Sequence, residues 1–311
     1  MRPMLATKGD VVPTGDEWSH EVKWDGVRML AEVADGAERA RLTTRNGNDA
    51  SIAWPDVHVA PMRGRDLLVD GEVIGINADG VPDFAVIQER MHVRSATTAA
   101  RLATTVPATF MVFDVMRLDG HDLTALPLAE RREILAGLDL GGWQVPPTYD
   151  DGLMLREATL AQGLEGIVSK RLTSRYEPGV RSRHWLKFAH RHRFSFVVGG
   201  WRPQEGTRDR LASLLVGQPT ADGLLYRGRV GSGISGAASR LLASELADHG
   251  ADASPFADDV PAIDASGTFW VEPSLVVDVD SLNRMPVQRL RQPSYRGIRT
   301  DIDATDLVGG Q

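Results

Sequence analysis

Lysine is rare in this chain of 311 residues, and its rarity draws attention to the few lysines present. Of the 35 basic residues, 31 are arginine and four are lysine. The amine of lysine can lose its proton and act as a nucleophile, whereas the guanidinium of arginine effectively cannot. The lysines are therefore the first candidates for covalent chemistry. They stand at Lys8, Lys23, Lys170 and Lys187.

Three of these lysines lie in short segments that combine charged residues with glycine. Lys23 opens the segment KWDGVR, in which a predicted Asp25-Gly26 turn groups Lys23, Asp25 and Arg28 around one mouth. Glycine at such a turn lets the backbone approach a ligand closely. A lone KxDG segment is more typical of a β-hairpin with an exposed lysine than of a catalytic site. It is followed in order by TRNG at residues 44–47, DGE at 70–72, FD at 113–114, EGIVSK at 165–170 and WLKF at 185–188.

The hydrophobic pattern places these segments on strands and turns of an α+β domain. Alternating apolar residues predict strands at 21–33, 67–76 and 110–118, with turns at Asp25-Gly26, Asp70-Gly71 and Asp119-Gly120. Helices are expected at 127–138 and at 153–162, the second ending at Gly163. Strands followed by helices favour an α+β fold over a doubly wound parallel sheet.

The pattern changes near residue 190, where we expect a domain boundary. Beyond it, strands are predicted at 194–201, 211–216, 224–230 and 269–280, with one helix at 235–249. Several strands with a single inserted helix fit a small closed barrel such as an OB-fold. The expected domains are therefore residues 1–190 and 191–311.

Composition excludes several classes of protein. Cysteine is absent, which excludes disulfides, cysteine-ligated zinc, iron–sulfur clusters and thiol catalysis. The sequence has no apolar run long enough for a membrane-spanning helix and no apolar secretory segment near its start. We therefore expect a cytoplasmic protein with no membrane partner.

Basic residues are concentrated in two stretches of an otherwise acidic chain. The formal net charge is −7, yet residues 170–210 hold eleven lysines and arginines against three acids. Residues 284–299 hold five arginines and no acid. Such stretches could bind a polyanion locally. The alternative is a pair of solvated arginine faces, and charge alone does not decide between the two.

In their order along the chain, the six segments resemble the nucleotidyltransferase motifs of the covalent ligase and capping-enzyme superfamily. The resemblance implies an α+β nucleotidyltransferase (adenylation) domain with antiparallel sheets, followed by a C-terminal OB-fold β-barrel as in ATP-dependent DNA ligases. Three further stretches look most like the bacterial end-joining ligases of the ligase C and ligase D type. These stretches are residues 3–6, 200–217 and 290–299.

The resemblance implies an ATP-dependent DNA ligase that seals 3′-hydroxyl and 5′-phosphate ends through a lysyl-AMP intermediate. Lys23 would attack the α-phosphorus of ATP, expel pyrophosphate and carry AMP covalently. Such an attack needs a neutral amine. Asp25 and Lys187 are the other implied catalytic residues. Glu165 and Asp25 would hold Mg²⁺ or Mn²⁺, which offsets charge developing on the phosphate oxygens.

Further residues match positions that contact ATP in the family. Glu21 would read the base edge, Phe113 and Val168 would stack on the two faces of adenine, and Glu72 would bind the ribose hydroxyls. A core role for Phe113 and Val168 is the alternative. Lys170 and Lys187 would contact the α-phosphate, and Arg299 would also contact ATP. Arg28 and Arg45 would contact the ribose or the 5′-phosphate of the nick.

The expected partner is nicked or broken double-stranded DNA, bound through its backbone without sequence preference. The expected DNA contacts are Arg28, Arg45, Arg181, Arg183, Arg202, Arg208 and Arg291. Likeness to end-joining ligases also implies a Ku-type end-binding protein and a repair polymerase as partners. We expect the chain itself to be a monomer.

Two positions depart from the family pattern and leave alternatives open. Ala189 and Ile302 stand where relatives usually have lysine. Each change removes a positive charge from the path of the triphosphate, so we expect slow self-adenylation. These changes also leave open a ligase remnant that binds DNA ends without catalysis. RNA ligases and GTP-using capping-type enzymes share the KxDG and EGIVxK-like segments, so both remain alternatives as well.

Overall fold

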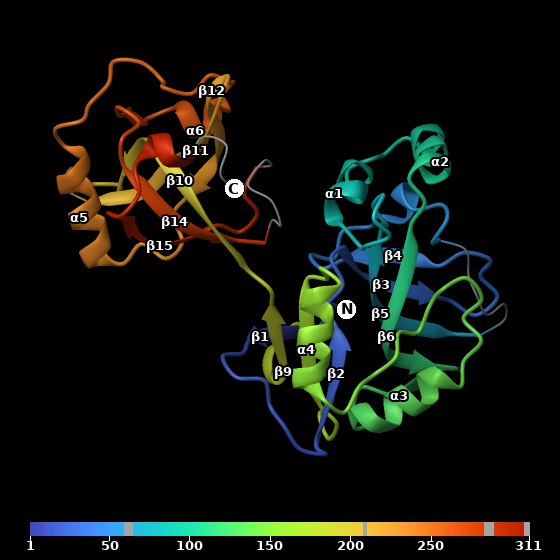
Figure 1. Cartoon of the computed structure of the whole chain (residues 1–311). Coiled ribbons are helices and arrows are strands. Elements are labelled where there is room, and N and C mark those ends of the chain that lie inside the picture. Colours follow the sequence, from blue (N-terminus) through green and yellow to red (C-terminus); the bar gives the residue numbers. More distant parts are fainter. Residues whose placement is uncertain (59–64, 208–209, 283–288, 308–311) are drawn as a thin grey trace. The chain divides into compact units, whose positions relative to one another are not determined.

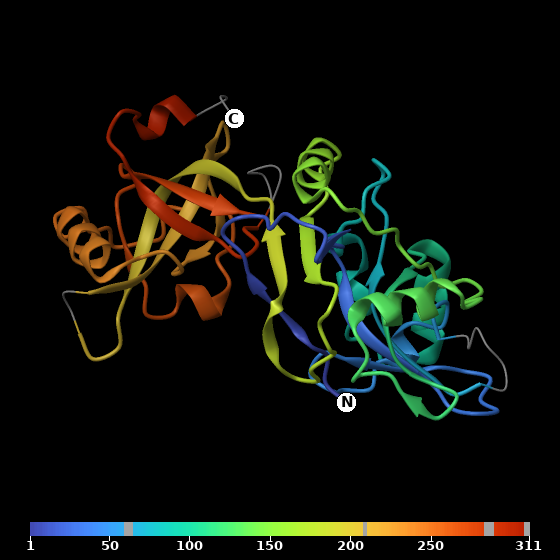
Figure 2. The same ribbon diagram turned by 90° about the horizontal axis from the view of Figure 1, so that it is seen from below.

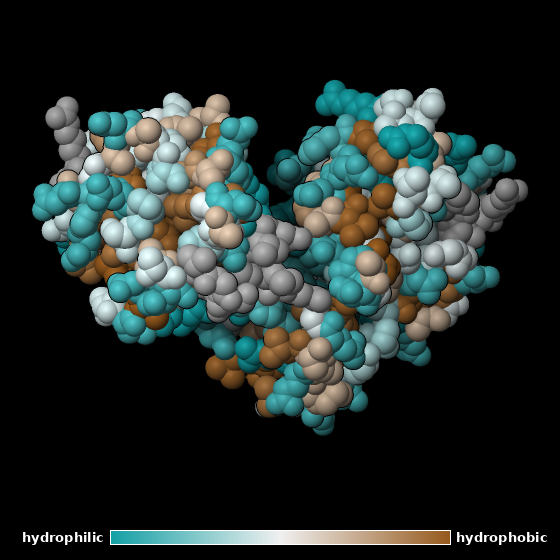
Figure 3. Space-filling model, turned by 45° about the horizontal axis from the view of Figure 1, so that its top comes forward, coloured by the Kyte–Doolittle hydropathy of each residue, from teal (hydrophilic) through white to brown (hydrophobic). Residues whose placement is uncertain are grey.

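The computed structural model describes residues 1–58, 65–207, 210–282 and 289–307. The chain divides into two compact units, Met1–His190 and Arg191–Gln311 (Figure 1). Each unit has its own sheets and hydrophobic core, and each is described by itself. Among the described residues no helix is long and apolar enough to cross a membrane. Hydrophilic residues cover most of the visible surface of both units (Figure 3).

A four-stranded sheet carries most of the segments that hold lysine. Its order is β1 (Leu5–Lys8), β9 (Arg181–Ala189), β8 (Gly166–Arg171) and β2 (Trp18–Val22). Strand β1 runs parallel to β9, beside which it lies in Figure 2, and the other pairs are antiparallel. Helix α4 (Gly152–Ala161) packs against β2 and β8 and buries Leu155 against Ile167 and Phe188. One face of this sheet is therefore covered by α4.

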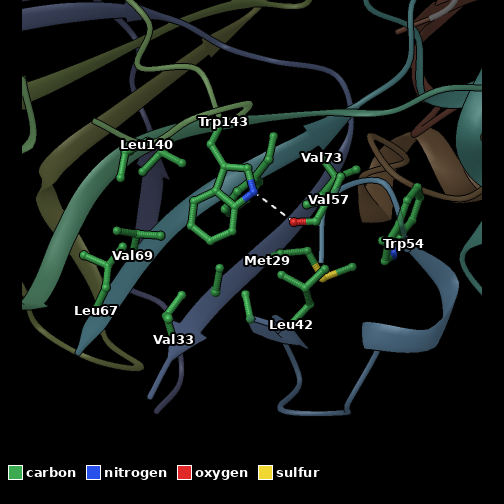
Figure 4. Close-up of a cluster of buried hydrophobic side chains, with 14 of the residues drawn as sticks. Met29, Val33, Leu42, Trp54, Val57, Leu67, Val69, Val73, Leu140 and Trp143 are labelled. Atoms are coloured by element: carbon green, nitrogen blue, oxygen red, sulfur yellow. Dashed lines mark hydrogen bonds between the residues drawn. The ribbon is translucent and has the colours of Figure 1, made fainter. Parts of the chain in front are cut away.

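A five-stranded antiparallel sheet forms the rest of the first unit. Its order is β4 (Arg41–Thr44), β3 (Val27–Val33), β5 (Leu67–Ile74), β6 (Thr109–Leu118) and β7 (His121–Asp122). Buried residues such as Met29, Leu42 and Val69 form its core together with Trp54 and Trp143 (Figure 4). The indole of Trp143 donates to the Val57 carbonyl oxygen at 2.9 Å, so its polar atom is satisfied inside the core.

Short helices complete the first unit. Helix α3 (Leu128–Ala136) packs beside β6, and α2 (Ala96–Thr105) is capped by the Ser95 side chain. The remaining elements are α1 (Phe84–Ile87) and the 3₁₀ turns at Ser51–Ala53 and Gln88–Arg90. The helices expected at 127–138 and 153–162 are confirmed within two residues at each end. Residues 84–105 were not expected to be helical.

Two Asp-Gly pairs differ from the turns that the sequence predicts. Asp25-Gly26 lies between strands of different sheets, because β2 belongs to one sheet and β3 to the other. Asp70-Gly71 lies inside the unbroken strand β5. A Cβ on Gly71 would stand 2.5 Å from the Met111 carbonyl oxygen. Glycine is therefore needed at 71 for close packing against β6, and not for a turn.

The second unit is built around a six-stranded antiparallel sheet. Its order is β12 (Gly223–Val230), β11 (Leu211–Thr220), β10 (His192–Pro203), β14 (Val276–Ser281) and β15 (Ser294–Arg299), and β13 (Phe269–Trp270) also pairs with β10. Helix α5 (Gly236–Leu246) packs on β11, and the unit also holds α6 (Ala262–Ala265) and a 3₁₀ turn at Ala304–Leu307. The run expected at 269–280 is thus two strands, and β15 was not expected.

Candidate active site

Lys23 lies where the chain passes from one sheet to the other, beside Glu165. The Lys23 Nζ is 2.5 Å from the Glu165 Oε1, and the two side chains are 22% and 11% exposed. The Lys23 amide donates to the Gly166 carbonyl oxygen at 2.9 Å, which fixes both side chains at one point. Gly166 has φ +143°, and a Cβ there would stand 2.1 Å from the Phe188 carbonyl oxygen. Glycine is therefore required next to Glu165.

Three predicted ATP contacts form one row across the four-stranded sheet. Glu21 on β2 pairs in register with Val168 on β8, and Val168 pairs with Lys187 on β9. Side chains in register on neighbouring strands point to the same face. The residue after Lys187, Phe188, packs on the opposite face of the sheet, beneath α4. Glu21, Val168 and Lys187 therefore lie on the face opposite α4.

Lys187 lies in a positive environment. Its pKa is lowered, first by burial and then by the positive charges of Lys23, Arg181 and Arg45, while Glu165 acts in the opposite direction. Lys187 is thus electrostatically coupled to both members of the Lys23–Glu165 pair. Positive charges that repel one another favour binding of an anion among them.

The Lys170 ammonium is enclosed beside Glu21. It is 2.7 Å from the Glu21 Oε2, with the side chains only 2% and 4% exposed. It also lies 4.4 Å from the centre of the Phe113 ring and 4.3 Å from that of Trp185. Burial and the ion pair tie Lys170 to Glu21 in this structure, and its predicted contact with the α-phosphate stays a prediction.

Arg28 is anchored in the same interior. Its guanidinium donates to both carboxylate oxygens of Asp70, at 2.5 and 2.6 Å, and to the Met4 carbonyl oxygen at 3.2 Å. The Tyr176 hydroxyl donates to Asp70 at 2.6 Å and accepts from the Met4 amide. In this structure Arg28 ties the N-terminal segment to β5. Its predicted contact with ribose or phosphate stays a prediction.

Phe113 is a core residue in this structure. Its side chain is 7% exposed and meets Trp185 edge to face, with ring centres 6.4 Å apart. The Arg28 guanidinium lies over the ring, 4.7 Å from its centre. Together with Lys170, two cations cover Phe113. Stacking of adenine on this ring stays a prediction that requires one of them to move.

Glu72 lies on β5, in register with Arg28 on β3. Burial raises its pKa to about 8, opposed by the positive charges of Arg28 and Lys23 and reinforced by the carboxylates of Glu165 and Asp70. The Glu72 carboxyl is therefore electrostatically coupled to both Lys23 and Glu165. This places the predicted ribose ligand in the same cluster as the predicted nucleophile.

The Glu72 pKa predicts a specific pH dependence of stability. A carboxyl whose pKa is higher in the folded chain than in the unfolded chain stabilises the fold most at low pH, and this contribution is lost as the pH rises to the folded pKa. The window runs from the ordinary value of 4.5 to about 8. We expect the free energy of unfolding of wild type to fall across this window relative to that of Glu72→Gln. Urea denaturation of both proteins across this window measures the difference, and a constant difference would contradict the assignment.

The predicted metal ligands do not form a closed site. Among the described residues no group of three or more His, Asp and Glu side chains could enclose a metal ion. The Asp25 Oδ2 accepts from the Phe84 amide at 3.3 Å. Mg²⁺ is usually held by one or two carboxylates together with substrate phosphates. Glu165, which lies beside Lys23, fits such a shared site.

Arginines predicted to bind DNA have varied surroundings. Arg45 is exposed in the turn that follows β4, and Arg183 is exposed on β9. Arg181 is exposed and donates to the Ala6 carbonyl oxygen at 2.7 Å. In the second unit, Arg202 donates to the Ile263 carbonyl oxygen at 3.0 Å. Arg291 is partly buried in this unit, and Arg208 lies outside the described residues.

Two arginines of the second basic stretch, Arg296 and Arg299, form ion pairs with nearby acids. Asp280 pairs with Arg193 at 2.8 Å and with Arg296 at 2.5 Å. Arg299 pairs with Asp301 at 2.7 Å and with Asp278 at 3.3 Å. Asp278 and Asp280 lie outside residues 284–299, on the strand that pairs with β15, so a count of charges within that stretch omits them. The predicted contact of Arg299 with ATP stays a prediction.

Sequence reasoning missed the residues that support the site. Asp70 on β5, Trp185 on β9 and Tyr176 in a loop contact Arg28, Lys170 and Phe113. Arg131 on α3 is fully buried and binds both carboxylate oxygens of Asp114. A buried acid next to a motif aromatic is the one signal that could have indicated such a partner.

The chain matches two family models along most of its length. Residues 3–188 match the "ATP dependent DNA ligase domain" and residues 207–302 match the "ATP dependent DNA ligase C terminal region". The "Multifunctional non-homologous end joining DNA repair protein LigD" of Mycobacterium tuberculosis is 35% identical over 99% of this chain. The chain spans 40% of the length of that relative.

Solved structures agree with this match. A structure described as mycobacterial DNA ligase D complexed with ATP and MES is 34% identical, with a TM-score of 0.58, over 99% of this chain and 97% of that one. The ligase domain of M. tuberculosis LigD is 35% identical, with a TM-score of 0.56, over 99% and 98% of the two chains. The chain belongs to the ATP-dependent DNA ligase family. The expected α+β adenylation domain with a C-terminal OB-fold is confirmed.

Proposed function

We propose that this chain seals 3′-hydroxyl and 5′-phosphate ends of nicked or broken double-stranded DNA in repair by end joining. The observation that carries the proposal is the Lys23–Glu165 pair, 2.5 Å apart at the edge of a face shared with Glu21 and Lys187. The amine, the carboxylate and a second cation are the groups that AMP transfer to a lysine requires.

In the proposed first step, the Lys23 ammonium releases one proton to water, and the neutral Nζ attacks the α-phosphorus of ATP. A phosphorus–nitrogen bond forms, the bond to the bridging oxygen breaks, and pyrophosphate leaves with its electron pair. Lys187 offsets the negative charge on the α-phosphate. Glu165 holds Lys23 in place and, with Mg²⁺ or Mn²⁺ bound, would serve as a ligand of the metal, which offsets phosphate charge. AMP then passes to a DNA 5′-phosphate and is released when the 3′-hydroxyl attacks.

A buried oxygen of Glu21 supports ATP over GTP. The Glu21 Oε1 is buried and has no hydrogen-bond partner within the described part of the chain. A carboxylate oxygen can only accept a hydrogen bond. Adenine offers an amino group at its 6-position, whereas guanine offers a carbonyl oxygen there. Glu21 would therefore accept a bond from adenine and repel guanine, with Val168 against the face of the base.

The relatives guide the proposed partners. The role of the LigD relative in non-homologous end joining supports DNA ends as the substrate. A Ku-type end-binding protein and a repair polymerase are the proposed protein partners, and the nucleoid is the proposed place of action. Arg45, Arg181 and Arg183 are the cations of the first unit that we propose to contact the DNA backbone.

Transfer of label from α-labelled ATP tests the proposal. The protein is stripped with pyrophosphate and incubated with labelled ATP or GTP and a divalent metal. Nicked DNA or nicked RNA is then added. We expect label on the protein from ATP only, followed by its loss and a sealed product with DNA. Label that moves only to RNA would indicate an RNA ligase, and label from GTP a capping-type enzyme. DNA binding without any label would indicate a remnant.

Ala189→Lys is expected to speed adenylation several-fold. Ala189 is two residues beyond Lys187 on β9 and shares its face, so lysine at 189 would extend into the same region. Ile302 is a poorer position to test, since it packs against a buried cluster that includes Leu307 and Phe256. The rate of label transfer in Ala189→Lys and in Ala189→Gln, which adds length without charge, measures the effect. Equal rates in the two variants would contradict it.

A further inference from the structure

Lys8 extends the row that crosses the four-stranded sheet. On β1, Lys8 pairs in register with Lys187 on β9, which pairs with Val168 and through it with Glu21. One row thus contains a residue from every strand of the sheet. With neighbouring strands roughly 4.8 Å apart, it spans about 14 Å from Glu21 to Lys8. This span is similar to the length of an extended nucleoside triphosphate.

Packing on both sides of Lys8 shows which face it shares. A Cβ on the next residue, Gly9, would meet the Phe188 ring, which packs under α4. Ala6, two residues before Lys8, packs with Trp185 and Met4 on the face opposite that of Gly9. Lys8 alternates with Gly9 and therefore projects on the face of Lys187, away from α4.

Lys8 is an available cation at this position. It is exposed, and no carboxylate pairs with it among the residues that the structure describes. Its neighbour Lys187 already senses the positive charges of Lys23, Arg181 and Arg45. A further unpaired ammonium at the outer end of the row extends this positive region away from the base position.

We propose that Lys8 contacts the β- and γ-phosphates of ATP and supplies part of the positive charge that Ala189 and Ile302 do not. The order of the row carries this assignment: Glu21 at the base, Val168 at its face, Lys187 at the α-phosphate, then Lys8 beyond it. The assignment rests on the proposed ATP site. Lys8 would therefore contact the pyrophosphate as it leaves.

Binding of two nucleotides, measured by calorimetry, tests the role of Lys8. One is α,β-methylene-ATP, which cannot transfer AMP, and the other is AMP, which lacks the outer phosphates. We expect Lys8→Ala to weaken binding of the analogue by roughly tenfold, the loss of one charge-assisted contact. Its affinity for AMP should not change. Lys8→Arg, which keeps the charge, should retain most of the affinity for the analogue.

Arg101→Ala serves as the matched control, because it removes one exposed positive charge on α2. It should change neither affinity. If Lys8→Ala weakens AMP and the analogue equally, Lys8 supports the sheet and the assignment is overturned. No change in either affinity would also overturn it while leaving the proposed function intact. A wild-type protein that binds neither nucleotide would overturn the proposed function and this assignment together.

Discussion

Lys23→Ala is expected to abolish the transfer of label from ATP to the protein, with a loss of more than about a thousandfold. The Lys23 Nζ is the amine held by Glu165 at the transition between the two sheets. Alanine leaves no nucleophile at this position. Lys23→Arg should be equally inactive, since a guanidinium keeps the charge and does not attack phosphorus.

A matched substrate separates loss of chemistry from loss of folding. A nick that already carries AMP on its 5′-phosphate needs no lysyl-AMP, so Lys23→Ala and Lys23→Arg should still seal it measurably. Arg101→Ala should behave as wild type with both substrates. Label that persists on Lys23→Ala protein would show that another amine accepts AMP, and Lys187, coupled electrostatically to Lys23, would then be the next candidate.

Asp114→Ala is expected to lower the free energy of unfolding by about 3–5 kcal/mol. Asp114 and Arg131 are both fully buried and joined by two hydrogen bonds, of 2.7 and 2.9 Å. The same guanidinium donates to the carbonyl oxygens of Leu126 and Ser174. Removal of the carboxylate leaves a guanidinium inside the core without a counter-charge. Urea denaturation followed by tryptophan fluorescence measures the loss.

Two variants give this prediction its controls. Arg65→Ala breaks an exposed pair with Asp119 and should cost much less, because water screens exposed charges. The double variant Asp114→Leu with Arg131→Met removes both charges and should recover much of the stability lost by Asp114→Ala. If Asp114→Ala costs no more than Arg65→Ala, the buried pair does not stabilise the fold as proposed.

The segments with chemistry could be predicted because each combines a local pattern with a local structure. Apolar alternation indicated the strand that carries Phe113, and glycine after Asp119 indicated a turn that the structure confirms. Asp70-Gly71 has the same local pattern without the turn. Gly71 is needed because the Met111 backbone of the neighbouring strand packs closely against it. Met111 is 40 residues away in the sequence, so a short segment around Gly71 does not reveal this contact.

Partnerships between distant residues explain the other differences. Lys170 meets Glu21, Phe113 and Trp185 from three other strands, and only the folded arrangement shows that its ammonium is enclosed. A sum of charges along residues 284–299 likewise omits Asp278 and Asp280, which precede that stretch. The register between strands, which aligns Lys8 with Lys187, also cannot be predicted from a single sequence.

The acids of strand β14 bear on how DNA binding should respond to ionic strength. Each cation that displaces a condensed counterion from DNA steepens the fall of affinity with salt, by close to one unit of logarithmic slope. Arg193, Arg296 and Arg299 already have Asp280, Asp278 and Asp301 as fixed counterions within the protein. A count of basic residues therefore overstates the slope. The counterions released on binding should reflect the unpaired cations, such as Arg45 and Arg183, and not the arginine-rich appearance of the sequence.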